Sequence, residues 1–258
     1  MELRGSTALI TGAAGGLGQA IARELAARGC TCVLSGRNTA GLERLAAEIG
    51  GEVVVADLLD PRDVDRLIDR AAEVDILVCN AGNGGDCSLQ EETSDHINEL
   101  LDVNLRVPMV MASQFAQDKL TTGEPARIVL IGSLAGLAAS PNTRLYNATK
   151  FGLRGFGLAL AQDLDGTNVS ASVVAPGFIR DAGMFADGDI DLPKAVRTKA
   201  PHDVALGVVR AIEGNQPEVF VAPTELRLSA TLATVAPALS ARIQKWAGVQ
   251  DRKGSNSM

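Results

Sequence analysis

A glycine-rich segment between an apolar strand and an amphipathic helix is the feature that most restricts the fold of this 258-residue chain. The apolar run 7–10 leads into Thr11–Gly18, which reads TGAAGGLG. Leu17, Ile21 and Leu25 then recur at helical spacing. Glycines let the backbone approach a pyrophosphate closely, and the amino end of the following helix favours its negative charge. The sequence therefore predicts a dinucleotide site made by strand, loop and helix, with a plain tight turn as the alternative.

A second constraint lies in residues 128–152, IVLIGSLAGLAASPNTRLYNATKFG. The apolar start predicts a buried strand, and Ser133 lies just past its carboxyl end. Tyr146 and Lys150 lie four residues apart in a segment with apolar residues at helical spacing, so they share a helix face. An ammonium beside a phenol favours the phenolate and lowers the pKa of the phenol. With the serine hydroxyl alongside, the three side chains can exchange a proton with an alcohol; a surface tyrosine, a surface lysine and a turn serine are the alternative.

The two segments occur jointly and in order, and here the chain resembles the classical short-chain dehydrogenase/reductase family over roughly residues 4–221. The positions that match are Thr11, Gly12, Gly16, Gly18, Ser133, Tyr146 and Lys150. The resemblance implies an α/β, single-domain Rossmann fold over residues 1–249, with a doubly wound, mainly parallel seven-stranded sheet flanked by helices. It also implies an oxidoreductase that transfers hydride between a nicotinamide cofactor and a secondary alcohol or ketone.

The resemblance further implies a role for each residue of the catalytic set. Tyr146 would act as general acid or base, Lys150 would lower its pKa and hold the nicotinamide ribose, and Ser133 would bond the substrate oxygen. Asn104 would complete a proton relay through water. Pro108 has no N–H, so the helical hydrogen bond back to the Asn104 carbonyl is missing and that carbonyl needs another partner. A proline kink with Asn104 bonding locally is the alternative.

The residues after the second strand indicate which nicotinamide cofactor is preferred. In folds of this kind an acidic residue about 20 positions past the glycines binds the ribose 2′-hydroxyl. Gly36 takes that place and Arg37 follows it. An arginine fork binds a 2′-phosphate that a carboxylate would repel, so we expect NADP(H) rather than NAD(H). Ala14, where many NADP-preferring relatives carry a basic residue, argues the other way, and a solvated Arg37 is the alternative.

Further cofactor contacts are implied by the resemblance at the ends of later strands. Asp57 would accept from the adenine amino group while Leu58 lines the ring pocket, because Asp60 is the better placed helix cap. Asp181 stands where many relatives carry a threonine and would repel phosphate, so that role is not carried over. The full expected set is Thr11, Gly12, Gly16, Leu17, Gly18, Arg37, Asp57, Leu58, Asn80, Ala81, Gly82, Tyr146, Lys150, Pro176, Gly177 and Ile179.

Composition excludes several other functions. A net charge of −7 argues against non-specific nucleic-acid binding, and the apolar runs are too short to span a bilayer. The amino terminus lacks the pattern of a signal peptide, which predicts a cytoplasmic protein. The four cysteines are expected to act as small buried hydrophobes. With two histidines and no close Cys/His spacing, no metal site is expected.

The last third of the chain contains the segments that we expect to contact the substrate and partner subunits. Residues 183–201 are predicted to form a substrate lid, and 250–258 a disordered tail. The apolar stripe in 224–247 predicts a helix packed on the body or on a subunit of a homodimer or homotetramer; an apolar flap or a shallow membrane contact is the alternative. Apolar residues around the site favour a hydrophobic substrate: Leu134, Leu137, Phe178, Met184 and Phe185. The competing functions are reduction of a 3-oxoacyl thioester, a steroid or a retinoid-like substrate, and a catalytically silent cofactor-binding scaffold.

Overall fold

A seven-stranded sheet in the order β3-β2-β1-β4-β5-β6-β7 forms the centre of the molecule, and every strand pairing in it is parallel. The computed structural model describes residues 1–85, 87–180, 197–239 and 242. The strands are β1 Thr7–Ile10, β2 Thr31–Gly36, β3 Glu52–Val55, β4 Ile76–Cys79, β5 Ala126–Ile131, β6 Val169–Pro176 and β7 Glu218–Val221. The expected α/β fold with its parallel seven-stranded sheet is confirmed.

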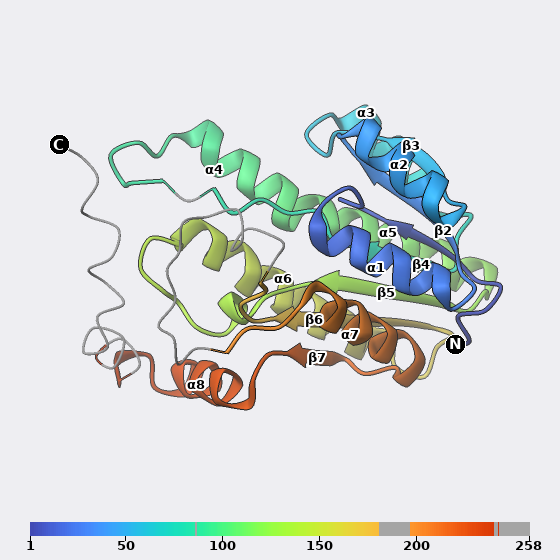
Figure 1. The fold of residues 1–258 in the computed structure, drawn as a ribbon. Coiled ribbons are helices and arrows are strands. Elements are labelled where there is room, and N and C mark those ends of the chain that lie inside the picture. Colours follow the sequence, from blue (N-terminus) through green and yellow to red (C-terminus); the bar gives the residue numbers. More distant parts are fainter. Residues whose placement is uncertain (86, 181–196, 240–241, 243–258) are drawn as a thin grey trace.

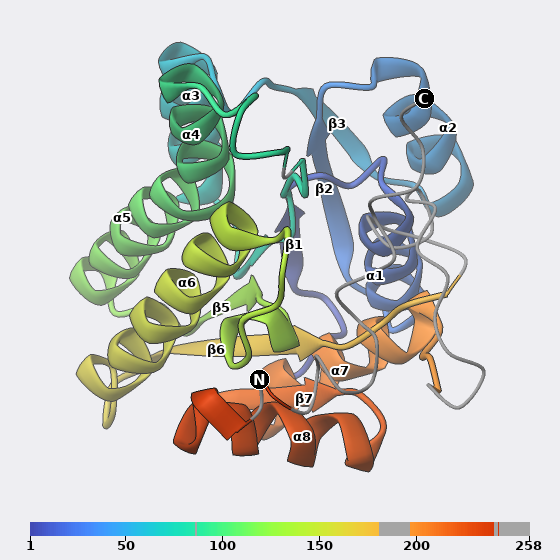
Figure 2. The ribbon, with the colours of Figure 1, turned by 90° about the vertical axis from the view of Figure 1, so that its left-hand side faces the viewer.

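Helices cover both faces of the sheet (Figure 1). They are α1 Gly16–Ala27, α2 Thr39–Ile49, α3 Pro61–Ala71, α4 Ser94–Leu101, α5 Val107–Thr122, α6 Arg144–Asp163, α7 Pro201–Gly214 and α8 Thr224–Val235. Figure 2 shows α1, α2 and α7 on one side and α3, α4, α5 and α6 on the other. Consecutive strand residues point to opposite faces, so fully buried Ile10 packs in the core under α1 while fully buried Leu9 packs in the core under α5.

The strand order reverses between β1 and β4, which are neighbours in the sheet although two strands separate them in sequence. In open parallel sheets, ligands bind outside the carboxyl ends of the strands at such a reversal. The glycine-rich loop follows β1 there, and Asn80 follows β4. The fold therefore brings the predicted nucleotide motif and the end of β5 to one edge.

The helix around Asn104 has an irregular turn in its middle. Between α4 and α5 the chain forms a π-helix, η1, over Asp102–Arg106. The N–H of Val107 donates to the carbonyl of Asp102, five residues back, instead of four. Pro108 follows at once and offers no N–H to the turn that contains Asn104. The wider turn lets the helix continue through the proline, so the chain forms a π-bulge here, which neither the expectation nor the alternative of a proline kink included.

The carboxyl-terminal segment is described only in part. In α8 the small residues Ala230 and Ala233 are buried, whereas Leu228 is 65% and Val235 is 80% exposed. The helix therefore packs on the described body through its small residues, and the larger apolar side chains of the stripe point away from it, so that a subunit contact for them stays a prediction. Most of the predicted lid 183–201, including Met184 and Phe185, lies outside the described residues, as do Asp181 and the 250–258 tail.

Candidate active site

Hydrogen bonds join the turn after β1 to the turn after β4. The hydroxyl oxygen of Thr11 accepts from the backbone N–H groups of Asn80, at 3.0 Å, and Ala81, at 3.1 Å. The side-chain amide of Asn80 in turn donates to the carbonyls of Thr11, at 2.9 Å, and Gly12, at 3.1 Å. The two predicted cofactor motifs thus form one rigid unit, and the amide of Asn80 supports the glycine-rich loop.

Two glycines in this unit have no room for a side chain. Gly12 has a φ of +63°, and a Cβ added to it would lie 2.8 Å from the Cα of Ala81. A Cβ added to Gly18 would lie 2.3 Å from the carbonyl oxygen of Gly12. The strand, the loop and the first turn of α1 therefore pack backbone against backbone, which any larger residue at either position would prevent.

The amino end of α1 fits the diphosphate of a dinucleotide. Gly15 and Gly16 are exposed there, Gly15 as N-cap has no side chain to satisfy the first N–H groups, and the first turn has no acidic residue. Unpaired N–H groups and the positive end of the helix dipole favour an anion. Leu17 follows in the same turn and is half-buried.

Lys150 lies buried in α6, with 4% of its surface exposed. Its Nζ donates to the carbonyl of Ile131, at the end of β5, over 2.9 Å, and lies 5.7 Å from the centre of the Tyr146 ring. Burial lowers the pKa of Lys150 to about 8, because a charged ammonium loses hydration there. The i, i+4 placement of Tyr146 and Lys150 on one helix is as predicted.

Ser133 stands two residues past the end of β5 and caps η2, a short 3₁₀ turn over Leu134–Gly136. Its Oγ accepts from the N–H of Ala135 at 3.1 Å. A Cβ added to Gly136 would lie 2.6 Å from the carbonyl oxygen of Lys150, so the turn rests directly on α6. This contact and the bond from Lys150 to β5 join the segment that carries Ser133 to the helix that carries Tyr146 and Lys150.

Asn104 is fully buried in η1 and faces the same region. A Cβ added to Gly82 would lie 3.1 Å from Asn104 Oδ1 and 3.7 Å from Lys150 Nζ, so Gly82 separates the two side chains. Asn104 Nδ2 also lies 3.4 Å from the hydroxyl of Thr149, which donates to the carbonyl of Tyr146 at 2.9 Å. Thr149 is not predicted from the sequence, where its only signal is its place beside Lys150.

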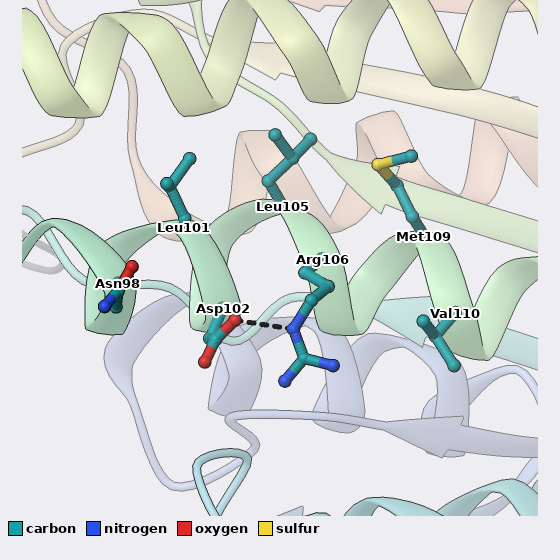
Figure 3. Close-up of a pocket in the computed structure, with 7 residues that line it drawn as sticks. All are labelled: Asn98, Leu101, Asp102, Leu105, Arg106, Met109 and Val110. Atoms are coloured by element: carbon teal, nitrogen blue, oxygen red, sulfur yellow. Dashed lines mark hydrogen bonds and ion pairs between the residues drawn. The ribbon is translucent and has the colours of Figure 1, made fainter.

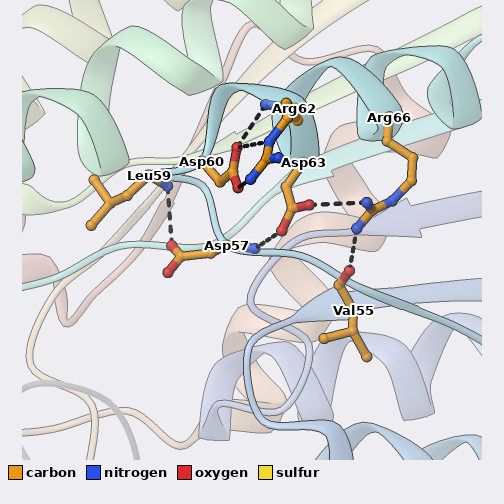
Figure 4. A network of polar contacts seen from close by, with 7 residues as sticks. All are labelled: Val55, Asp57, Leu59, Asp60, Arg62, Asp63 and Arg66. Carbon is orange, nitrogen blue, oxygen red and sulfur yellow. Dashed lines mark hydrogen bonds and ion pairs between the residues drawn. The ribbon is translucent and has the colours of Figure 1, made fainter.

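The turn after β3 differs from expectation in one respect (Figure 4). Asp60 caps α3 by accepting from the N–H of Arg62 at 2.9 Å, as predicted. Asp57 is not free of local partners, however: its Oδ1 accepts from the N–H of Leu59 at 3.0 Å, and its own N–H donates to Asp63 at 2.8 Å. An aspartate side chain that accepts from the N–H two residues further along forms an Asx turn, a common local arrangement. The turn is thereby fixed, and buried Leu58 lies beside it.

The remaining expected cofactor residues lie at the carboxyl ends of strands on either side of β1 and β4. Arg37 is exposed just past β2. Pro176 ends β6, and the N–H of Gly177 donates to Val221 at 3.0 Å. A Cβ added to Gly177 would lie 3.3 Å from Leu134 Cδ1, next to Ser133. Ile179 is buried and forms an isolated bridge with Lys199.

Outside this edge, a hollow of about 440 Å³ lies on the outer face of the helix pair around η1 (Figure 3). Its lining is Asn98, Leu101, Asp102, Leu105, Arg106, Met109 and Val110.

Across residues 1–85, 87–180, 197–239 and 242, no group of three or more His, Cys, Asp and Glu side chains is arranged to hold a metal ion. The helices within those ranges are also too short or too polar to cross a bilayer.

A doubly wound parallel sheet with a glycine-rich loop at its reversal point defines a nucleotide-binding Rossmann protein. A family model described as short chain dehydrogenase matches residues 6–190, and the chain belongs to the short-chain dehydrogenase family of oxidoreductases, whose members bind NAD(P)(H) and a small-molecule substrate.

Individual relatives are similar over most of the chain. The ketoacyl reductase HetN of Nostoc sp. is 32% identical over 263 residues, which cover 96% of this chain and 91% of that protein. The 3-oxoacyl-[acyl-carrier-protein] reductase FabG of Rickettsia bellii is 34% identical over 182 residues, which cover 70% of this chain and 75% of that protein. Among solved structures, a short-chain dehydrogenase from Sphingobium yanoikuyae in complex with NADPH has a TM-score of 0.76 at 25% identity and covers 98% of both chains.

Proposed function

We propose that this protein is an NADP-dependent oxidoreductase that interconverts a secondary alcohol and a ketone on a hydrophobic substrate. The observation that carries the proposal is the placement of Lys150. Its ammonium is buried between the carbonyl of Ile131 and the ring of Tyr146, at the edge of the sheet where the glycine-rich loop lies. Burial of a cation costs desolvation free energy, and this cation lies beside a phenol, an arrangement typical of functional sites.

Each side chain has a task in the proposed reaction. Tyr146 gives its proton to the substrate oxygen in reduction and takes it back in oxidation, and the ammonium of Lys150 stabilises the phenolate. The Oγ of Ser133 already accepts from Ala135, which leaves its own proton to donate to the substrate oxygen. Asn104 fixes the helix next to Lys150 and completes the proton relay through water. The nicotinamide, when bound, supplies or receives the hydride.

The cofactor preference rests on Arg37. An exposed guanidinium just past β2, with Gly36 in place of a carboxylate, suits a 2′-phosphate. The Sphingobium neighbour was solved with NADPH, which supports the same preference without deciding it. The proposed NADP(H) contacts include the amino end of α1 for the diphosphate and Leu58 for the adenine ring.

Reduction of a 3-oxoacyl thioester is the second candidate function. It uses the same residues and the same proton and hydride transfers, and it is favoured by the names of two relatives, a ketoacyl reductase and a 3-oxoacyl-[acyl-carrier-protein] reductase. A substrate screen separates the candidates when it includes simple hydrophobic ketones and 3-oxoacyl thioesters of matched chain length.

The first experiment is calorimetric titration with NADPH and NADH side by side. We expect tighter NADPH binding that Arg37→Ala weakens about 10- to 100-fold, the range of a hydrogen bond to a charged group. Arg44→Ala, which removes another exposed arginine from α2, should leave both affinities unchanged. Equal or tighter NADH binding contradicts the preference for NADP(H).

The second experiment is the carbonyl screen with the wild type and Tyr146→Phe. We expect the variant to lose most turnover while cofactor affinity stays nearly intact, because the phenol oxygen serves the proton transfer. Turnover that persists in Tyr146→Phe contradicts the assignment. Tight cofactor binding without turnover of any carbonyl or alcohol supports the silent scaffold instead.

We propose further that the chain acts in the cytoplasm as a homodimer or homotetramer. The hollow around η1 supports the assembly, since the side chains of Leu101, Leu105 and Val110 line an outer helix face, and Leu101 and Val110 are each 37% exposed. Apolar helix faces of this kind are commonly covered by a second subunit.

A further inference from the structure

The side chain of Asn147 joins the turn that carries Ser133 to the helix that carries Tyr146. It is 5% exposed. Its amide nitrogen donates to the carbonyls of Ala135, at 2.8 Å, and Ala138, at 3.1 Å. Its oxygen accepts from the N–H of Ser140, at 3.2 Å, and from the hydroxyl of Thr143, at 2.6 Å. The amide thus uses both donors and both lone pairs, its full capacity.

A short chain of bonds connects this amide to the proposed substrate-binding hydroxyl. Ala135 donates its N–H to the Oγ of Ser133 and accepts at its carbonyl from Asn147. Asn147 is the residue after Tyr146 in α6. One side chain therefore fixes the peptide that holds the serine hydroxyl, and it is anchored to the backbone that holds the phenol.

The connection between β5 and α6 depends on such bonds for its shape. Residues 132–143 contain no regular structure beyond the 3₁₀ turn η2, so no ladder of backbone hydrogen bonds holds most of them. Four of the bonds that do hold them converge on Asn147. Fixing an irregular segment opposes its conformational entropy, and a buried amide with every bond made is suited to that task.

We propose that Asn147 is a positioning residue, which sets the hydroxyl of Ser133 relative to the phenol of Tyr146. This inference rests on the proposed function, because it matters only if both groups must reach one substrate oxygen. A misplacement of about 1 Å at a reacting centre costs about 10²-fold in rate. Asn147 acts through Ser133 and has no contact with substrate of its own.

The test is Asn147→Ala, assayed well below its melting temperature in the carbonyl screen of the wild type. We expect kcat to fall about 10- to 100-fold. The dissociation constant for NADPH should stay within about twofold, because the glycine-rich loop is held by Thr11 and Asn80 instead. Ala148→Ser, an exposed neighbour in the same helix turn, is the control and should keep the wild-type kcat.

A double-mutant cycle with Ser133→Ala separates positioning from general structural damage. If Asn147 works through Ser133, the double variant is no slower than Ser133→Ala alone. If the two losses multiply, Asn147 acts elsewhere and the inference is overturned. A loss of NADPH affinity equal to the loss of kcat overturns it as well.

Thr143 provides a milder version of the test that does not depend on Asn147→Ala folding. Thr143→Ala removes one of the four bonds, and Thr143→Ser keeps the hydroxyl. We expect a smaller loss of kcat in the first, about threefold to tenfold, and rescue in the second; equal activity of the two overturns the inference. An active wild type with full kcat in Asn147→Ala overturns this inference alone, whereas a wild type that turns over no carbonyl overturns the proposed function itself.

Discussion

The side-chain amide of Asn104 pairs with the backbone of Asn83 through two hydrogen bonds, each 2.7 Å long. Asn104 Oδ1 accepts from the N–H of Asn83, and Asn104 Nδ2 donates to its carbonyl. The pair resembles one rung of a sheet, formed here between a buried π-helix and the loop after β4. It ties the helix face next to Lys150 to the segment that follows the nucleotide motif.

Asn104→Ala is expected to destabilise the fold as well as slow turnover. The substitution leaves the N–H and the carbonyl of Asn83 without these partners, at about 1–3 kcal/mol for each group left unsatisfied. Denaturant unfolding of the cofactor-free protein should show a loss of about 2 kcal/mol or more. Gln162→Ala, which removes an exposed amide from α6 outside the hollow, is the control. Equal stability of the two variants would mean that the pair contributes nothing.

Most of the fold, but only part of the site, could be predicted from the sequence. Strand and helix positions follow from apolar periodicity. The glycine spacing identifies the loop, because only glycine fits at Gly12 and Gly18, where a Cβ would clash with neighbouring backbone. The π-bulge was not predicted, since the missing N–H of Pro108 is compatible with a kink or with a wider turn. The partners Asn83 and Asn147 were not predicted either, because a polar side chain in a loop or helix gives no sign of which distant backbone groups it will meet.

Gly136→Ala is expected to separate the Ser133 turn from α6. The new Cβ would lie 2.6 Å from the carbonyl oxygen of Lys150, so the turn must shift. Overpacking of this kind costs about 1–3 kcal/mol, and turnover should fall more than NADPH affinity does. Gly155→Ala in α6 is the matched control: its Cβ meets nothing within 4 Å, and it should gain up to about 1 kcal/mol in helix propensity. If both variants behave alike, close packing at Gly136 is not what places Ser133.

Lys150 makes stability depend on pH in a defined window. Burial lowers its pKa in the folded, cofactor-free chain to about 8, from the ordinary value of 10.5. Between these values the unfolded chain binds more protons than the folded one, so stability rises with pH through the window. Relative to Lys150→Met, the wild type should gain about 3 kcal/mol in unfolding free energy between about pH 8 and 10.5. Parallel denaturation curves at several pH values measure this difference, and a difference that does not change with pH contradicts the burial of the ammonium.

Only Cys87 is expected to react readily with an alkylating agent at about pH 7.5. Burial raises the pKa of Cys30 to about 11 and that of Cys32 and Cys79 to about 12, so these thiols stay protonated. Cys87 is half-buried, so its sulfur can be reached from solvent, and its Sγ lies 3.4 Å from Nδ1 of His96. Native labelling with iodoacetamide followed by peptide mass spectrometry should show Cys87 modified first. Equal labelling of all four cysteines contradicts this.

Val110→Asp is expected to break the proposed assembly of subunits. Val110 lines the hollow on the outer face around η1 and is 37% exposed, so a carboxylate there disturbs no core of the single chain but would be buried by a second one. Sedimentation velocity should show a dimer or tetramer for the wild type and a smaller species for the variant. Leu120→Asp tests the specificity of this surface, because Leu120 is 46% exposed on the same helix, α5, but lies outside the hollow. That variant should sediment as the wild type does; if it dissociates equally, or if the wild type is already monomeric, this face is not the subunit interface.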